Sequence, residues 1–465
     1  MKTFKNLWES FVSYENLFIA AIKACQRKRY KPAVLEFNNN LGENLLQLQK
    51  ELQDGEYMPG SYKYFKITEP KERDVYAAPY RDRIVHHALL NVLEPIWEKR
   101  FYYHSYACRK EKGMHRAIDI CQKYIRQNKY ILKCDIRKYF QSIDHKLLMH
   151  IIKKRIADKK LLDLIFMIIN FSPQMDTPYI LYSNDDLFTY FERKKGVPIG
   201  NLTSQFFANV FLNELDHWVK HNNKIKHYIR YMDDFLLFHN SKSYLRNVRQ
   251  QMEGFLDSMR LTLHPQKTQI LPSKDGVAFL GFHIKSDVKR LRKANIQRFV
   301  KRMKIQQKLY SNYSIDLAYI KQSINAWIGH AGHGDTYKLI AKLLYNYPLK
   351  RGRDRNLNDD YKYFANRSKD LPIESCVAVI GTTTQTTTIY ARGTATTTLR
   401  QTATTTSVFD VPILKKISDQ ELYGAFGDYG VQIYSSCKRR KEKNTRQLVG
   451  NESCQSLFNS NTLKV

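Results

Sequence analysis

The sequence has no long apolar stretch and few cysteines. These two features disfavour several classes of protein. No run approaches the roughly 18 apolar residues of a membrane span, and the N-terminus, Met1-Lys-Thr-Phe-Lys, lacks the apolar core of a signal peptide. The seven cysteines among 465 residues include no C-x-x-C pair, which disfavours structural zinc and a disulfide framework. We therefore expect a cytoplasmic protein with reduced thiols and no membrane partner.

Acidic residues are also in the minority. There are 76 Lys and Arg against 44 Asp and Glu, a formal net charge of +32. Such an excess makes a phosphate backbone the natural partner and predicts salt-dependent binding. The 31 Tyr and 24 Phe supply stacking surfaces for bases. A passive nucleic-acid binder would share this composition, so the motifs must decide whether the chain is an enzyme.

The most informative motif is an adjacent acid pair, Asp233 and Asp234, within Tyr228–Phe238. Two short runs rich in aromatic and aliphatic residues flank the pair, which predicts a hairpin with the carboxylates at its tip. The strand-like run Tyr130–Ile136 delivers a third acid, Asp135. In isolation the pair is typical of a solvated turn. Beside buried strands, however, acids are costly unless a cation neutralises them, so converging carboxylates indicate a two-Mg²⁺ site for nucleotidyl transfer.

Three further segments follow the same logic. Gly196–Gln205, with an apolar run over 206–215, predicts a Gly/Pro-punctuated loop that opens a helix, a floor for a template base and an incoming nucleotide. Leu261–Thr268 places Lys267 after a strand-like stretch. Phe279–Ile284 predicts another short strand around a glycine.

In this order the motifs resemble those of bacterial reverse transcriptases, most closely the enzymes of diversity-generating retroelements and related antiphage defence enzymes. The resemblance runs from about Leu45 to Leu344. Its other blocks are Ala78–Ala88, Ser105–Gly113, Asp135–Phe140 and Ala326–His333. It implies an α+β right-hand polymerase fold, with fingers, a palm with a small antiparallel sheet, and a helical thumb. It also implies RNA-directed DNA polymerase activity with two Mg²⁺ ions, for which Mn²⁺ substitutes.

The resemblance assigns roles residue by residue. Asp135, Asp233 and Asp234 match the catalytic, metal-binding acids. Arg109 matches a basic residue of the fingers that holds the triphosphate, where a guanidinium fork suits phosphate oxygens. Lys267 matches a residue that neutralises or protonates pyrophosphate, although an ordinary surface lysine is the alternative.

The other implied nucleotide-binding residues are Phe140, Ile199, Gly200 and Gln205. Phe140 matches the aromatic gate that excludes a ribose 2′-hydroxyl; ordinary core packing is its alternative. Group II intron and retron enzymes carry Gln-Gly and then Ser-Pro in the loop that here reads Ile199-Gly200 and Ser204-Gln205, which is similar to diversity-generating retroelement enzymes that copy template adenines with errors. An isoleucine offers no amide hydrogen bonds, so it should loosen base selection, unless it merely packs.

The pattern along the chain predicts four regions. They are an N-terminal helical region over 1–60, fingers and palm over 61–272, a helical thumb over 273–349, and a linker with a Thr-rich and aromatic C-terminal extension over 350–465. The threonine repeats of the extension suit either a β-ribbon or a low-complexity linker. Its tyrosines, Tyr423, Tyr429 and Tyr434, suit a docking surface or protein priming.

Three functional hypotheses follow. A reverse transcriptase in antiphage defence is favoured by the extension, and an error-prone reverse transcriptase of a diversity-generating retroelement is the alternative. A catalytically silent RNA-binding scaffold is a third class, which the intact acids disfavour. The implied partners are an RNA template, a DNA product, dNTPs, a dedicated non-coding RNA, and an accessory protein or a second copy of the chain.

Overall fold

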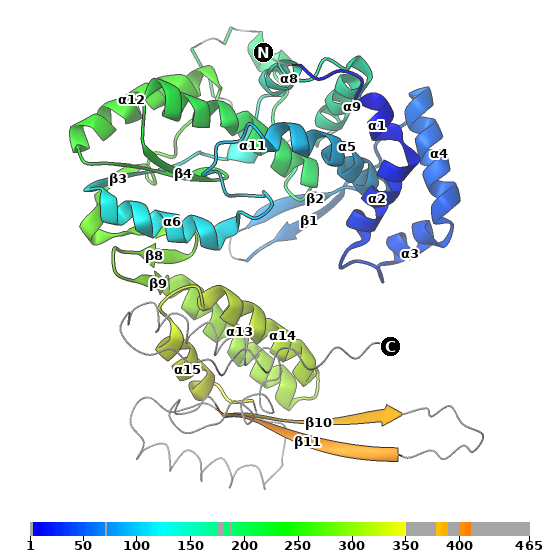
Figure 1. Ribbon diagram of the computed structural model, residues 1–465, viewed down its shortest axis with the longest axis vertical. Helices are drawn as coiled ribbons and strands as arrows, with labels where there is room; N and C mark the ends of the chain where they lie inside the picture. Colours follow the sequence, from blue (N-terminus) through cyan, green and yellow to red (C-terminus); the bar gives the residue numbers. More distant parts are fainter. Residues whose placement is uncertain are drawn as a thin grey trace, which may run out of the picture. The chain divides into compact units, whose positions relative to one another are not determined.

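The computed structural model describes residues 3–69, 72–173, 180–183, 185–186 and 188–349, together with the backbone of 378–388 and 400–410. The chain divides into two units, Met1–Arg292 and Lys293–Val465. The first unit holds the four-stranded central sheet and most of the described helices (Figure 1). Among the described residues, no helix combines the length and apolar character needed to cross a membrane.

The first unit begins with four helices, as the apolar spacing of residues 1–60 predicted. They are α1 (Trp8–Val12), α2 (Tyr14–Cys25), α3 (Pro32–Asn39) and α4 (Leu41–Asp54). The Ser13 hydroxyl accepts a hydrogen bond from the Asn16 backbone N–H, which caps the start of α2. Gly55 ends α4 in the left-handed conformation, with φ of 76°. The apolar face of α2 packs against α5 (Tyr80–Glu98).

An exposed hairpin follows these helices. Strands β1 (Lys63–Ile67) and β2 (Arg73–Ala77) pair antiparallel, and β1 is solvent-exposed along its whole length. Both strands lie below α11 and α5 in Figure 1. The hairpin therefore presents its basic side chains, Arg73 among them, to solvent.

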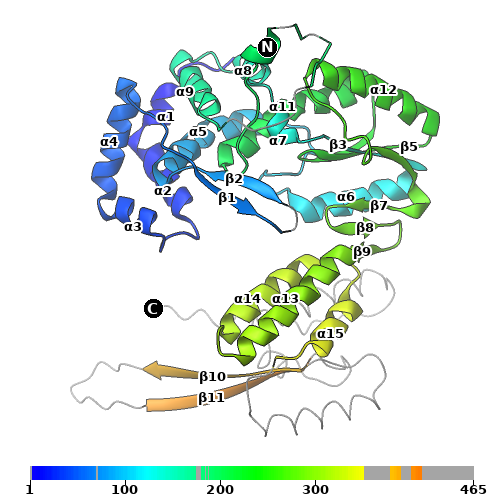
Figure 2. The ribbon, with the colours of Figure 1, turned by 180° about the vertical axis from the view of Figure 1, so that it is seen from behind.

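The centre of the unit is a four-stranded antiparallel sheet in the order β4-β5-β3-β6. Its strands are β3 (Tyr130–Asp135), β4 (His227–Tyr231), β5 (Asp234–His239) and β6 (Gln269–Pro272). Figures 1 and 2 both show α12 (Lys242–Ser258) and α6 (Gly113–Gln127) on opposite sides of this sheet. Residues 235–238 of β5 are all buried, as expected of a strand covered on both faces.

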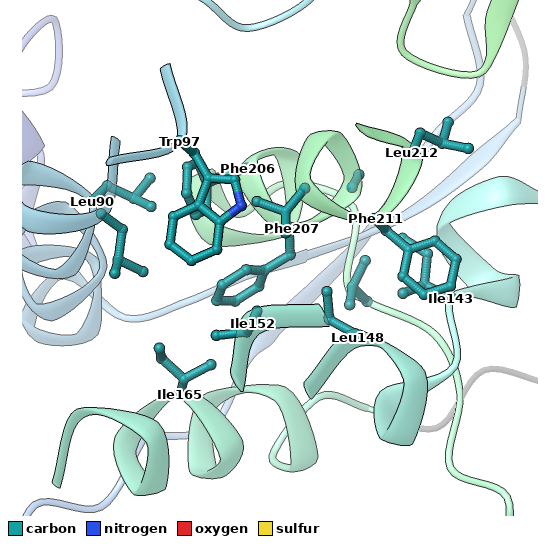
Figure 3. Packing of buried hydrophobic residues seen from close by; sticks show 14 of the residues in the cluster. Leu90, Trp97, Ile143, Leu148, Ile152, Ile165, Phe206, Phe207, Phe211 and Leu212 are labelled. Carbon is teal, nitrogen blue, oxygen red and sulfur yellow. The ribbon is translucent and has the colours of Figure 1, made fainter. Parts of the chain in front are cut away.

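The hydrophobic core joins the sheet to a group of helices. One of these is α11 (Leu202–His217), which buries Phe206, Phe207, Phe211 and Leu212. Figure 3 shows these rings against Leu148 and Ile152 of α8 and Trp97 of α5. The remaining helices of the unit are α7 (Tyr139–Ser142), α8 (His145–Lys153), α9 (Lys159–Asn170), α10 (Thr189–Glu192), the π-helix η1 (Trp218–Asn222) and the 3-10 helix η2 (Ser273–Asp275).

One expectation about the strands was wrong. The segment 279–284 forms a turn between two strands, where a single strand was expected. These strands, β7 (Val277–Phe279) and β8 (Phe282–Ile284), make a three-stranded sheet with β9 (Lys289–Leu291). Leu280 and Gly281 both have positive φ, 47° and 87°, which is the conformation of a tight two-residue hairpin turn.

The second unit contains the helices α13 (Lys293–Ser311), α14 (Leu317–Ala331) and α15 (Tyr337–Asn346). Phe299 and Trp327 stack with ring centroids 3.7 Å apart, which joins α13 to α14. Further along, β10 (Ala378–Thr388) and β11 (Arg400–Asp410) pair antiparallel, so these threonine-rich segments form a ribbon. The three tyrosines proposed for docking or priming lie outside the described residues.

Candidate active site

The predicted hairpin of the acid pair is confirmed. Strands β4 and β5 meet at a turn of two residues, Met232 and Asp233, and Asp234 opens β5 opposite Tyr231. Met232 has φ of 57°, the left-handed region that few non-glycine residues adopt. The turn therefore holds the two carboxylates at one end of the central sheet.

The third acid reaches the same end of the sheet from β3. Asp135 is the last residue of that strand, and the β3–β5 register pairs it with Asp234. Directly opposed residues of an antiparallel pair share a face, with Cβ atoms about 4.5–5.5 Å apart. The structure thus brings together all three acids, which are separated by about a hundred residues of sequence.

Burial and mutual repulsion disfavour the charged forms of these acids. Burial is the largest cause that raises the pKa of Asp234, to about 7, and the neighbouring Asp135 and Asp233 add to it. Lys133 and Lys267 act in the opposite direction. The pKa of Asp233 is raised as well, chiefly by burial and then by Asp135. The site therefore gains from any cation that joins it.

Lys267 already supplies one positive charge. Its Nζ donates to Asp135 Oδ1 at 2.7 Å, and the lysine side chain is 40% exposed. The strand expected before Lys267 is reduced to one bridge, between Ile136 and Leu263, and Lys267 itself lies in a turn. This contact places Lys267 beside the acids, and its role at the pyrophosphate stays a prediction.

The donor set suits a hard divalent ion. Asp234 Oδ1 is buried and has no hydrogen-bond partner among the described residues. Carboxylate oxygens are the ligands that Mg²⁺ and Mn²⁺ prefer, and Mg²⁺ in polymerase sites takes one or two carboxylates plus substrate phosphates. In the part of the chain that the structure describes, no three acidic, His or Cys side chains form a ready-made metal cage. The chemistry of the carboxylate oxygens is what fits a hard divalent ion here.

Sequence reasoning missed one cation near the acids. Arg73, on β2, lowers the pKa of Asp233 through its positive charge, opposing the effect of burial. It lies on the exposed β1–β2 hairpin, far from the acids in sequence. The signal that could have found it is the cluster of basic residues on this hairpin.

Phe140 and the Gly196–Gln205 loop lie together. Phe140 belongs to the short helix α7, is half-buried and packs against the core. Its carbonyl accepts a hydrogen bond from the Val197 backbone N–H at 2.8 Å. This contact ties the segment that follows Asp135 to the loop before α11.

The Ile199-Gly200 turn of this loop rests on β2. The Tyr76 backbone N–H donates to the Ile199 carbonyl at 3.0 Å. Gly200 has φ of 119°, and a Cβ there would lie 2.8 Å from Val75 Cγ1, so a side chain would be strained and crowded. The predicted loop is therefore docked on the same strand that carries Arg73.

Arg109 and Gln205 line one cavity, which does not include the three acids. The Arg109 guanidinium contacts Glu98 through Nε at 3.0 Å and through a second nitrogen at 2.5 Å, and it donates to the Tyr102 and Ser105 carbonyls. Its side chain is only 5% exposed. The Cys108 thiol donates to Gln205 Oε1 at 3.3 Å, and these residues line a cavity of about 420 Å³ between α2, α5 and α11. A triphosphate would have to displace Glu98, so the nucleotide role of Arg109 stays a prediction.

Comparison with known proteins agrees with this geometry. The family described as reverse transcriptase (RNA-dependent DNA polymerase) matches residues 70–284, which include the three acids, Phe140 and Lys267. YkfC of Escherichia coli (strain K12) is 28% identical over 284 residues, covering 52% of this chain and 72% of that protein.

More distant relatives are encoded in introns. The group II intron-encoded protein LtrA of Lactococcus lactis subsp. cremoris is 23% identical over 309 residues, covering 52% of this chain and 50% of that protein. A putative COX1/OXI3 intron 1 protein of Saccharomyces cerevisiae is 24% identical over 301 residues, covering 52% and 35%. The chain therefore spans half or less of these two proteins.

Among solved structures, a Candida albicans telomerase shares 14% identity at a TM-score of 0.34, covering 62% of this chain and 57% of that chain. The sequence matches are more informative. The chain contains a reverse transcriptase domain with bacterial relatives of the group II intron and YkfC type at low identity. Residues 70–284 thus match a domain of RNA-dependent DNA polymerases.

The raised pKa of Asp234 predicts how stability depends on pH. The unfolded chain ionises this acid near its ordinary pKa of about 3.9, whereas the folded, metal-free protein holds the proton up to about 7. Between these values the folded state binds more protons, so stability falls as pH rises through that window. Asp234→Asn cannot ionise and should melt at a higher temperature than wild type at pH 8 with EDTA, by about 2–4 °C per kcal/mol relieved.

At pH 4 the melting temperatures of Asp234→Asn and wild type should converge, and Mg²⁺ at pH 8 should raise that of wild type alone. Asp163→Asn, at an exposed position of α9, is the control and should show no pH-dependent difference from wild type. A lower melting temperature for Asp234→Asn than for wild type at pH 8 would contradict the buried, proton-holding role of Asp234.

Proposed function

We propose that the protein synthesises cDNA on an RNA template by two-metal nucleotidyl transfer. The observation that carries the proposal is the β3–β5 register, which sets Asp135 opposite Asp234 beside the turn that holds Asp233. The same three residues fall within the reverse transcriptase match over 70–284. The net charge of +32 supports an RNA template and a DNA product as partners.

In this proposal the carboxylates of Asp135, Asp233 and Asp234 hold two Mg²⁺ ions. Bound there, the ions would activate the primer 3′-hydroxyl and neutralise the charge of the leaving pyrophosphate. In the structure, the ammonium group of Lys267 is hydrogen-bonded to Asp135 Oδ1. With Asp135 engaged by a metal ion, Lys267 would be free to donate to the departing pyrophosphate.

The nucleotide would lie between the loop and the hairpin. Gly200 and Ile199 sit against β2, and Phe140 is hydrogen-bonded through its backbone to the start of the same loop. Arg73 adds positive charge on that strand, where a triphosphate would need it. Arg109 and Gln205 would act from the cavity that they line.

The first test removes one carboxylate charge at a time. Asp233→Asn and Asp135→Asn should each lower Mg²⁺-dependent dNTP incorporation on a primed RNA template by about 100-fold or more, because several kcal/mol of charge stabilisation is lost. Asp163→Asn, an exposed acid on α9, is the matched control and should retain activity. Wild-type rates in Asp233→Asn would refute the site. No incorporation by the wild-type protein would favour the silent RNA-binding scaffold.

The second test concerns sugar choice. Phe140→Ala should open space at the nucleotide C2′ and raise the ratio of rNTP to dNTP incorporation by about 10-fold or more. Phe166→Ala, at an exposed position of α9, controls for the loss of an aromatic ring. If the ratio is the same in Phe140→Ala and wild type, Phe140 is a packing residue.

The biological context is a finer proposal, and we infer a role in antiphage defence. Its support is the extension over 350–465, because the resembling enzymes of diversity-generating retroelements typically end soon after the thumb. A dedicated non-coding RNA as template belongs to the same proposal. Sequencing the RNA and DNA that copurify with the protein would identify the template. A gene neighbourhood with a template and variable repeat pair would favour diversification.

The alternative, an error-prone enzyme of a diversity-generating retroelement, depends on Ile199. Ile199→Gln should lower misincorporation opposite template adenine by about 2–10-fold, the range of one hydrogen bond. Ile199→Leu keeps the apolar side chain and should leave the error spectrum of the wild type unchanged. Deep sequencing of products from a defined template measures both, and equal spectra in all three proteins would return Ile199 to a packing role.

A further inference from the structure

A buried ion pair lies next to the turn of Met232 and Asp233, which we call the catalytic turn. Arg230, on β4, and Asp216, on α11, are both 0% exposed. Arg230 Nε donates to Asp216 Oδ1 at 2.7 Å, and a terminal nitrogen donates to Asp216 Oδ2 at 2.6 Å. The Tyr228 hydroxyl also donates to Asp216 Oδ1, at 2.8 Å. Buried charges are stable only when they are paired and hydrogen-bonded. The pair therefore keeps the Arg230 and Asp216 side chains in one orientation.

The other terminal nitrogen of Arg230 reaches the turn itself. It donates to the Met232 carbonyl at 3.3 Å and to Asn209 Oδ1 at 3.0 Å. Met232 is the residue with positive φ immediately before Asp233. Backbone held in such a conformation persists only where its surroundings determine it, and here the guanidinium satisfies the carbonyl of the strained residue.

The same residue also fixes a second loop. The Arg230 backbone N–H donates to the His104 carbonyl at 3.0 Å, and its carbonyl accepts from the Tyr106 N–H at 2.9 Å. Asn209, which accepts from Arg230, donates to the Ala107 carbonyl at 2.8 Å. Arg230 thereby connects helix α11, the loop that carries Arg109, and the turn that carries Asp233.

We propose that Arg230 is a positioning residue for nucleotidyl transfer: clamped by Asp216, its guanidinium fixes the Met232 carbonyl and so orients Asp233 toward the metal ion. The inference rests on the proposed function of the three acids. Arginine suits this role because its planar fork donates from three nitrogens to Asp216, Asn209 and Met232 at once, whereas a lysine ammonium donates from a single nitrogen.

The principal test is Arg230→Lys, which keeps the charge opposite Asp216 and loses the fork. It should lower kcat by about 10–100-fold and raise the Mg²⁺ concentration for half-maximal activity, as for other residues that orient metal ligands. The KM for dNTP should stay within about twofold, since Arg230 contacts the loop of Arg109 through its own backbone groups, which the substitution keeps. A loss of folded protein alone would lower the apparent kcat and leave the Mg²⁺ requirement unchanged.

Arg260→Lys is the matched control. Arg260 pairs with Asp144 at 2.7 Å and Asp185 at 2.9 Å, so this variant also replaces the fork of a paired arginine. It should leave the Mg²⁺ requirement of the wild type unchanged, whatever it does to the melting temperature. An equal shift in the Mg²⁺ requirement in both lysine variants, or none in Arg230→Lys, would overturn the proposal.

Two further measurements keep the proposal testable if Arg230→Lys folds poorly or if the wild-type protein shows no polymerase activity. The double variant Arg230→Met with Asp216→Leu removes both buried charges, which limits the cost to folding, and should show the same raised Mg²⁺ requirement. Mn²⁺ binding, followed by electron paramagnetic resonance with Asp233→Asn as reference, needs no turnover. Weaker Mn²⁺ binding in folded Arg230→Lys supports the positioning role even if polymerisation fails. Wild-type Mn²⁺ affinity in that variant, or wild-type Mn²⁺ binding that does not depend on Asp233, overturns it.

Discussion

The antiparallel pairing of β3 with β5 is the constraint on which the candidate site depends. It sets Asp135 opposite Asp234, and the adjoining turn adds Asp233, so three acids share one end of a buried sheet. Burial and repulsion raise the pKa of Asp233 and Asp234, which makes a bound cation favourable. Lys267 supplies one positive charge to the acids through its 2.7 Å contact with Asp135, and its side chain is 40% exposed. In the proposed reaction a metal ion would take over that neutralising role.

Helix α11 connects the Ile199-Gly200 loop with the turn of Met232 and Asp233. Its first turn follows the Ile199-Gly200 loop, which rests on β2, while Asn209 and Asp216 further along hold Arg230 under the catalytic turn. The rings of Phe206, Phe207 and Phe211 anchor the helix in the core (Figure 3). A buried, well-packed helix has little freedom to shift. Loop and turn therefore keep a fixed spacing, which suits a reaction that depends on the alignment of metal ions and nucleotide.

Positive charge is distributed in a way that fits a polyanionic partner. The β1–β2 hairpin exposes basic residues, and the positive charge of one of them, Arg73, lowers the pKa of Asp233. The helix α13 of the second unit is likewise rich in Lys and Arg. In contrast, Arg109 is neutralised by Glu98 and nearly buried. Exposed cations suit the phosphate backbone, whereas an arginine already paired contributes to substrate binding only by exchanging its partner.

The sequence by itself determined the elements that local patterns encode. The apolar runs beside the acid pair, the strand ending at Asp135 and the loop that opens α11 were all predicted, because propensity and turn chemistry act over a few residues. Tertiary structure alone decided the rest. The hairpin at Leu280-Gly281 needed a leucine with positive φ, which no local pattern announces. The partners of Arg230 and Arg109 were decided by how strands and helices pack, and a contact between two different elements leaves no periodic trace in the sequence. The effect of Arg73 on Asp233 likewise depends on where the hairpin lies.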